Sequence, residues 1–345
     1  MTRNIKVLWI DDDFRHIEDA RNLESVRKSL RVSLLHPCDL DKRLTQYKDS
    51  DGTGWDIFLV DYYLNLNVKD NQKYPYLGLT VAANIRETFV EHPIYLVTAQ
   101  MDDGKARLDG WAQAVEASFD AILTLKDVQR QGARIYYDAL DYRSVRQCTR
   151  ENLEALLELA VAPHGVRGRL KLVLPDELKE GLAPATSSNV AGNAIAFTKW
   201  VRGLLLMTPG FLYDDLHTST YLGISSETFA KLSSRFGRAK YSGIFSRSTV
   251  PLWWVSELDN ILFSYTKTQK IGTTNPWEVA PLVFNVSNEH KTKCAVCGGL
   301  SPETVGINLQ DDDDLRPVHY RCSQPHSKKT RKLYFDEPRA FKLPS

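Results

Sequence analysis

The first 140 residues alternate short apolar runs with segments of helical spacing, and this alternation restricts the fold more than any other feature. Apolar runs separated by amphipathic helices are typical of parallel strands buried on both faces of a sheet. We therefore predict an α/β domain whose doubly wound parallel sheet has five strands. The expected strands are Lys6–Ile10, Val32–Leu35, Trp55–Val60, Pro93–Val97 and Ala121–Leu125. The expected helices are Arg15–Leu30, Leu40–Tyr47, Gly78–Phe89, Lys105–Ser118 and Val128–Leu140.

Polar side chains with possible chemistry follow four of these strands. Asp11 and Asp12 follow the first strand, Asp61 follows the third, Thr98 the fourth and Lys126 the fifth. In an open parallel sheet, ligands bind beyond the carboxyl ends of the strands. These side chains are therefore expected at one edge of the sheet.

Three carboxylates, a hydroxyl and an ammonium group suit phosphoryl transfer. Carboxylates bind a hard cation such as Mg²⁺, and the cation removes their mutual repulsion. We predict that Asp11, Asp12 and Asp61 hold Mg²⁺. Asp61 can also attack phosphorus and form an aspartyl phosphate. Thr98 and Lys126 can donate hydrogen bonds to the phosphoryl oxygens and stabilise the charge that develops during transfer.

Residues 5–140 resemble the receiver domain of two-component response regulators, on the motifs DD at Asp11, WDIFLVD at Asp61, LVTA at Thr98 and ILTLK at Lys126. The resemblance implies a flavodoxin-like fold, with the acidic pair at Asp11 and Asp12 and the phosphoacceptor at Asp61. It implies that Thr98 is the switch hydroxyl and that Lys126 matches the family's invariant lysine. Gly78 and its helix resemble the segment after the phosphoacceptor loop. A histidine kinase or other phosphodonor protein is the implied partner.

Three features depart from that family pattern. The stretch Tyr62–Leu77 is longer than usual, Asp127 stands where a proline is common, and Leu123 stands where an aromatic residue is frequent. Phosphorylation on Asp61 is therefore the first hypothesis, and an inactive pseudo-receiver that serves as an adaptor is the alternative.

A second cluster of metal-binding residue types lies near the C-terminus. Cys294 and Cys297 form a Cys-x2-Cys pair before two glycines, and His319 and Cys322 follow with a spacing of three. Two thiolates from one tight turn, with two more donors on one helical turn, suit tetrahedral Zn²⁺. The pattern loosely resembles zinc-ribbon and treble-clef modules, and a closed donor set predicts a structural role. His326 competes with His319 as the fourth ligand, and reduced cysteines in a core without metal are the alternative.

The segment 211–250 has the spacing of a helix-turn-helix. Gly223 marks a turn and Ser225 is a candidate helix cap. The basic and aromatic residues that follow could form a hairpin wing that contacts phosphate. They are Arg235, Phe236, Arg238, Lys240, Tyr241, Phe245 and Arg247. DNA binding is therefore one hypothesis, and a solvated basic face beside core aromatic residues is the other.

The whole chain has 345 residues and five cysteines, which is an odd number and argues against a disulfide framework. It opens with a strand, and no apolar run approaches the roughly 20 residues of a membrane helix, so we expect a cytoplasmic protein without membrane contact. We predict a receiver-like domain over 1–145, a helical connector and linker over 146–193, and an aromatic-rich output domain over 194–290. A zinc-binding module and basic tail follow over 291–345, which makes the C-terminal region α+β.

The leading hypothesis is a signalling protein without enzymatic activity beyond its own phosphorylation. Its C-terminal region would bind a protein effector, and a homodimer is compatible with it. DNA-binding regulation is the second hypothesis, and an enzyme of unrecognised class within residues 150–345 is the third.

Overall fold

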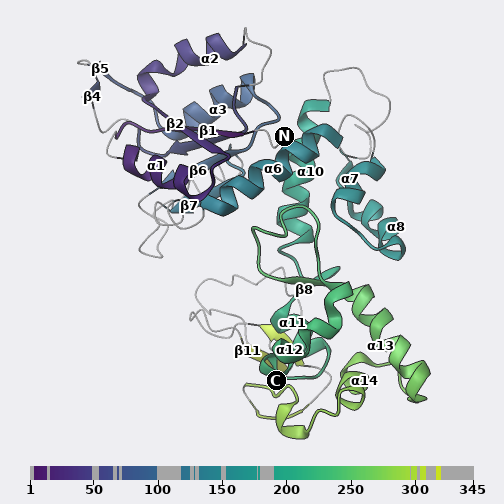
Figure 1. Cartoon of the computed structure of the whole chain (residues 1–345). Coiled ribbons are helices and arrows are strands. Elements are labelled where there is room, and N and C mark those ends of the chain that lie inside the picture. Colours follow the sequence, from purple (N-terminus) through teal and green to yellow (C-terminus); the bar gives the residue numbers. More distant parts are fainter. Residues whose placement is uncertain are drawn as a thin grey trace, which may run out of the picture. The chain divides into compact units, whose positions relative to one another are not determined.

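The computed structural model describes residues 4–13, 16–48, 54–64, 68–69, 72–98, 118–124, 128, 132–148, 153–176, 178, 190–295, 297–300, 304–307 and 316–319. The chain divides into two compact units (Figure 1). The first comprises Met1–Leu159 and Pro175–Lys199, and the second comprises Ala160–Leu174 and Trp200–Ser345. The four-part division expected from the sequence stays a prediction.

A five-stranded sheet forms the centre of the first unit. Its order is β2-β1-β3-β6-β7, and every neighbouring pair is parallel. This is the strand order of the flavodoxin-like doubly wound class, so the predicted sheet is confirmed. The strands are β1 (Ile5–Ile10), β2 (Leu30–Leu35), β3 (Ile57–Asp61), β6 (Ile94–Thr98) and β7 (Ala121–Thr124).

Helices of the first unit pack in two groups. α1 contacts β2 and α6, and α6 also contacts β1, whereas α2 contacts α3, which in turn contacts β3. Leu8 and Val60 belong to the core that includes residues of α2 and α3. Val7 and Trp9 alternate with Leu8 along the strand and are also fully buried, so both faces of the sheet are covered. The helices are α1 (Ile17–Val26), α2 (Leu40–Lys48), α3 (Gly78–Thr88) and α6 (Gly132–Cys148).

The long segment between β3 and α3 contains a short antiparallel pair, β4 (Val68–Lys69) and β5 (Gln72–Lys73). At its start, Tyr62 and Leu64 are buried in the same core as α3. The predicted helix Lys105–Ser118 lies outside the described residues apart from Ser118. Two more helices belong to this unit, α7 (Leu153–Leu159) and α10 (Val190–Trp200) up to Lys199.

The second unit is mainly helical, with two short antiparallel strand pairs. Its helical segments are α8 (His164–Val173), η4 (Val201–Leu205), α11 (Asp215–Tyr221), α12 (Ser226–Leu232), η5 (Ser233–Ala239), α13 (Val255–Gln269), α14 (Pro276–Val283) and η6 (Asn288–His290). The strands are β8 (Leu212–Asp214), β9 (Leu252–Trp254), β10 (Thr304–Ile307) and β11 (Arg316–His319).

The helix pair predicted around Gly223 is present as α11 and α12. Ser225 caps α12 by accepting a hydrogen bond from the Thr228 N–H, as the sequence predicts. Gly223 has a positive φ of 67°, and a Cβ at this position would lie 2.6 Å from the carbonyl oxygen of Trp277. The turn therefore requires glycine both for its backbone conformation and for the close approach of α14.

The predicted basic hairpin wing is wrong. Ser233–Ala239 is a 3₁₀ helix, and the side chains of Phe236, Tyr241 and Phe245 are at most 3% exposed. Large aromatic side chains gain much more from burial than from a solvated wing, so they join the core. Arg238 pairs with Glu257 at 2.8 Å. DNA binding by this segment stays a prediction, but the hairpin wing no longer supports it.

None of the helices in the described ranges is long and apolar enough to cross a lipid bilayer.

Candidate functional site

Three aspartates meet at the carboxyl end of the central strands. Ile10 of β1 pairs with Val60 of β3, so Asp11 and Asp61 come one residue later on neighbouring strands. Oxygen atoms of Asp11, Asp12 and Asp61 all lie within 4.8 Å of one another. The sequence-predicted carboxylates are therefore brought together.

Hydrogen bonds fix two of these carboxylates. Asp11 Oδ1 accepts the Asp13 backbone N–H at 2.8 Å, and Asp11 Oδ2 lies 2.7 Å from Nδ1 of His16. Asp61 Oδ2 accepts the Tyr63 backbone N–H at 3.0 Å. These contacts hold the carboxylates in place on the sheet edge.

His16 is a site neighbour that the sequence reasoning missed. Its ring stacks on Trp9, with 5.7 Å between the ring centroids. The hydrogen bond with Asp11 is the main reason that the pKa of His16 is raised. The only signal in the sequence is a histidine five residues after the first aspartate, immediately before the first helix.

The electrostatics of the site favour a bound cation. Burial, together with the charges of Asp11 and Asp12, raises the pKa of Asp61 to about 7, although hydrogen bonds from the N–H groups of Tyr62 and Tyr63 act in the opposite direction. Asp11 and Asp12 are only 2% and 4% exposed. Carboxylates so close together and so poorly hydrated are stabilised by a hard cation, and Mg²⁺ takes such oxygen ligands.

Gly78 at the start of α3 lies against the backbone of Asp61. Its N–H donates to the carbonyl oxygen of Tyr62 at 2.8 Å. A Cβ on Gly78 would lie 2.2 Å from the carbonyl oxygen of Asp61. Only glycine therefore allows α3 to begin this close to the end of β3.

Thr98 ends β6, the strand next to β3. Asp61 pairs with Val97, and the Thr98 side chain is 6% exposed. Leu123, which stands where the receiver family often has an aromatic residue, is 2% exposed in β7. Lys126 and Asp127 lie outside the described residues, so the predicted role of Lys126 is untested.

Comparisons with known proteins give matches among solved structures alone. No family model matches the chain, and no curated protein matches it. One match is the signal receiver domain of an HD domain-containing protein from Pseudomonas fluorescens Pf-5. The matched region covers 43% of this chain and 95% of that domain, at 16% identity and a TM-score of 0.32.

Two further matches have similar values. The Mn²⁺-bound response regulator Rcp1 covers 38% of this chain and 94% of its own, at 15% identity and a TM-score of 0.28. The CheY-like receiver domain protein from Methanospirillum hungatei JF-1 covers 39% and 96%, at 12% identity and a TM-score of 0.28. The strand order and the parallel pairing within this chain decide the fold. The first unit has the flavodoxin-like doubly wound fold, the class to which CheY also belongs.

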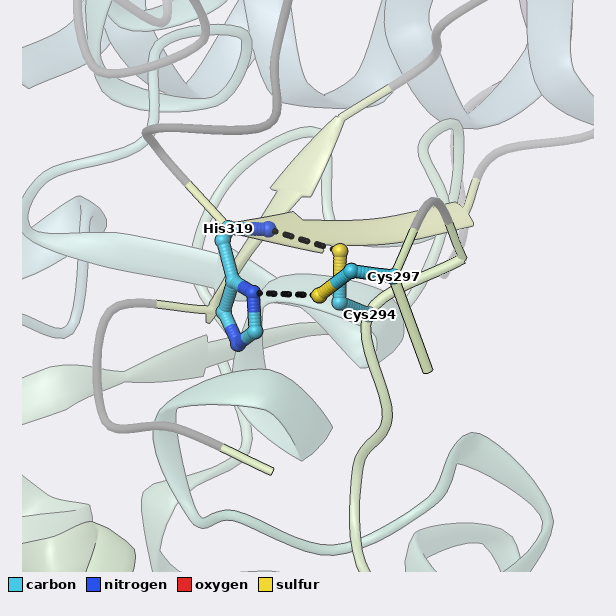
Figure 2. Close-up of side chains that lie close together, drawn as sticks. All are labelled: Cys294, Cys297 and His319. Carbon is cyan, nitrogen blue, oxygen red and sulfur yellow. Dashed lines mark hydrogen bonds between the residues drawn. The ribbon is translucent and has the colours of Figure 1, made fainter. Parts of the chain in front are cut away.

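A second group of side chains that can bind a metal lies outside the receiver fold. Figure 2 shows Cys294, Cys297 and His319 pointing toward one another. Their ligand atoms all lie within 4.8 Å of one another. The predicted helical turn at His319 is wrong, because His319 ends strand β11, where β-branched Val318 pairs with Val305 of β10.

The other two predicted zinc donors, Cys322 and His326, lie outside the described residues. That Cys322 is a ligand, and that His319 and not His326 completes the set, stay predictions.

The enzyme hypothesis called for a deep polar pocket in the C-terminal region. One hollow there has a volume of about 340 Å³. It is lined by Tyr221, Asp259, Asn260, Leu262, Phe263, Thr266, Thr274 and Pro276. The Tyr221 hydroxyl donates to Asp259 Oδ1 at 2.6 Å, and these lining residues include no histidine, cysteine or serine. Enzymatic activity in the C-terminal region stays untested.

Proposed function

We propose that the first unit is a phosphoacceptor domain of two-component signalling, and that Asp61 takes the phosphoryl group. The observation that supports this most directly is the meeting of three carboxylates within 4.8 Å at the end of β1 and β3. Three neighbouring carboxylates repel one another, so their proximity is unfavourable unless a bound cation or a reaction requires it. The receiver fold gives a family in which that reaction is phosphoryl transfer.

Asp61 acts as the nucleophile in this proposal. One of its carboxylate oxygens forms a bond to the phosphorus of the donor. The bond between phosphorus and the donor atom, a histidine nitrogen or the oxygen of a small phosphodonor, breaks, and the donor atom keeps the electron pair. Asp11, Asp12 and Asp61 would hold Mg²⁺, which when bound neutralises carboxylate and phosphoryl charge.

Two further side chains have roles toward the phosphoryl group. The Thr98 hydroxyl, on the strand adjacent to Asp61, donates a hydrogen bond to a phosphoryl oxygen. Lys126 supplies a positive charge to another. Donors placed in advance at a site where charge develops are effective because they need no reorganisation.

The partners follow from the same proposal. A histidine kinase or another phosphodonor protein supplies phosphate to Asp61, and the second unit passes the signal to a protein effector in the cytoplasm. Burial of Phe236, Tyr241 and Phe245 leaves the alternative, a DNA-binding wing, without support. A homodimer is one assembly through which the signal could be read.

The test of the acceptor is intact-mass analysis after incubation with a small phosphodonor and Mg²⁺. The wild type should gain one phosphoryl group, and both Asp61→Asn and removal of Mg²⁺ should abolish the gain. Asp13→Asn is the matched control, because the backbone N–H through which Asp13 bonds to Asp11 is kept in this variant. It should still be labelled.

Two results would contradict the proposal. Unchanged labelling of Asp61→Asn would place the acceptor elsewhere. A wild type that is never labelled, although it binds Mg²⁺, would favour the inactive pseudo-receiver.

Signalling to the second unit requires its own measurement. A beryllofluoride-type phosphoryl mimic should change amide hydrogen exchange beyond residues 1–145 or change the oligomeric state, and Thr98→Ala should weaken that change. If the mimic binds and neither readout moves, the receiver is a docking module and does not drive the rest of the chain.

A further inference from the structure

The second unit contains a donor set that the phosphoacceptor proposal does not use. Cys294 and His319 are 2% and 0% exposed, whereas Cys297 is exposed. The Cys297 Sγ lies 3.2 Å from Nδ1 of His319. We infer that these three side chains bind a structural zinc ion, which fastens the strand pair β10–β11 and the loop before it to α11.

Their separations suit tetrahedral zinc. With Zn–S bonds of about 2.3 Å and Zn–N bonds of about 2.0–2.1 Å, neighbouring donor atoms in a tetrahedron are roughly 3.5–3.8 Å apart. The three donor atoms here lie within 4.8 Å of one another, and Cys297 Sγ and His319 Nδ1 are 3.2 Å apart. The Cys297–His319 pair would therefore have to separate by only a few tenths of an ångström to accommodate an ion.

The backbone around the two cysteines forms a closed turn. The Gly298 N–H donates to the carbonyl oxygen of Cys294 at 2.8 Å, and the Cys294 N–H donates to that of Gly299 at 3.1 Å. Gly298 has a positive φ of 68°, which glycine adopts without strain. The turn thus brings both sulfur atoms to one side before any metal binds.

Backbone hydrogen bonds also tie this turn to β11. The His319 N–H donates to Cys294 Sγ at 3.4 Å (Figure 2). The Ala295 N–H donates to the carbonyl oxygen of Pro317 at 2.9 Å, which ties the turn to β11.

A thiol–imidazole pair without metal is the main competing explanation. It would account for the contact between Cys297 and His319, but it does not require a second cysteine whose sulfur lies within 4.8 Å of both. Three soft or borderline donors converging from two chain segments are typical of zinc. The second cysteine therefore favours a metal ion over a pair of reacting side chains.

The chain before the cysteines is fastened to the α11–α12 helix pair. Thr292 is 2% exposed, and its hydroxyl donates to the carbonyl oxygen of Ile224 at 2.5 Å. The Ser225 N–H donates to the carbonyl oxygen of His290 at 2.8 Å. α11 also contacts both β10 and β11. The chain before the cysteines therefore contacts the α11–α12 pair, and so does the strand pair β10–β11. Zinc that joins the turn to β11 would link these two contacts.

The first test is metal analysis of the full-length chain, purified without chelator. About one zinc per chain is expected, and Cys294→Ser and His319→Ala should lose it. Cys148→Ser, at the end of α6 in the first unit, is the matched control and should retain it. His319→Cys restores a zinc donor and should recover the metal, which separates lost ligation from general misfolding.

Cobalt substitution and hydrogen exchange complete the test. Co²⁺ added to metal-free protein should give thiolate-to-cobalt and tetrahedral absorption bands. Chelation should lower amide protection in α11 and β11 and leave β1 and β3 unchanged. A wild type without zinc, without a cobalt spectrum and with rapid alkylation of Cys297 would overturn the inference. So would bound zinc whose removal leaves the protection of α11 unchanged.

Discussion

Replacement of Gly78 by alanine tests how closely the fold and the phosphoacceptor site are joined. The added Cβ would lie 2.2 Å from the carbonyl oxygen of Asp61, about 1.2 Å short of the 3.4 Å at which ordinary contact begins. It would also lie 3.1 Å from Cα of Tyr62. The obstructing atoms are backbone atoms of a strand that pairs with β6, so no side-chain rotation relieves the overlap.

The magnitude follows from the nature of this overlap. Overpacking a well-ordered core costs about 1–3 kcal/mol, and contact with fixed backbone belongs at the upper end. For a unit of this size, about 3 kcal/mol corresponds to a lower melting temperature by roughly 6–12 °C. Because the Asp61 carbonyl must move, Gly78→Ala should also slow phosphorylation of Asp61.

Gly168→Ala is the matched control, since it makes the same chemical change inside α8. A Cβ at Gly168 meets no heavy atom within 4 Å. Replacing an unhindered helical glycine should stabilise the protein by about 0.5–1 kcal/mol and leave phosphorylation unchanged. Calorimetry measures both effects, and hydrogen exchange of the β3 peptide assigns the loss to the first unit. Wild-type stability of β3 in Gly78→Ala would refute the reasoning.

Two other predictions concern protons and zinc. Burial, helped by the charges of Arg146 and Arg86, lowers the pKa of His92 to about 3, so from about pH 6.5 down to 3 the unfolded chain binds a proton that the folded chain does not. The free energy of unfolding should therefore fall as pH drops through this window, by up to about 1.4 kcal/mol per pH unit. Urea titrations measure this dependence, and His92→Phe should make it shallower. An equal dependence of stability on pH in the wild type and in His92→Phe would contradict the reasoning. For zinc, Cys322→Ser should weaken binding in a competition titration and His326→Ala should not. The reverse result would show that His326 is the ligand.

The sheet could be predicted because its strands are nearly all apolar. Residues Ile57–Val60 are fully buried, and Asp61 is the first charged residue after them. Such a run has no solvent-facing side, so only a central strand of a covered sheet accommodates it. The end of the strand then fixes where the aspartate must lie, and the meeting of Asp11 with Asp61 follows from topology.

Helix α8 lies within the helical connector predicted over 146–193, but its bounds were not predicted from the sequence. Val166 and Leu170 are its buried residues, while Leu172 is 77% exposed, and Gly165 and Gly168 lower its intrinsic helix propensity. Its ends are set by tertiary packing, which a local pattern does not report. The contact of His16 with Asp11 was missed for a similar reason, because it depends on how the chain enters α1.

The two errors in the second unit differ in what they cost the functional argument. His319 was expected on a helical turn and lies in a strand, yet its predicted partners Cys294 and Cys297 are beside it. Donor identity and convergence define a metal site, and more than one backbone conformation can supply them. The hairpin wing, in contrast, depended on exposure of Phe236 and Tyr241, and burial of both removes it. Predictions that rest on the chemistry of a side chain therefore survive an error in secondary structure, whereas predictions that rest on its exposure do not.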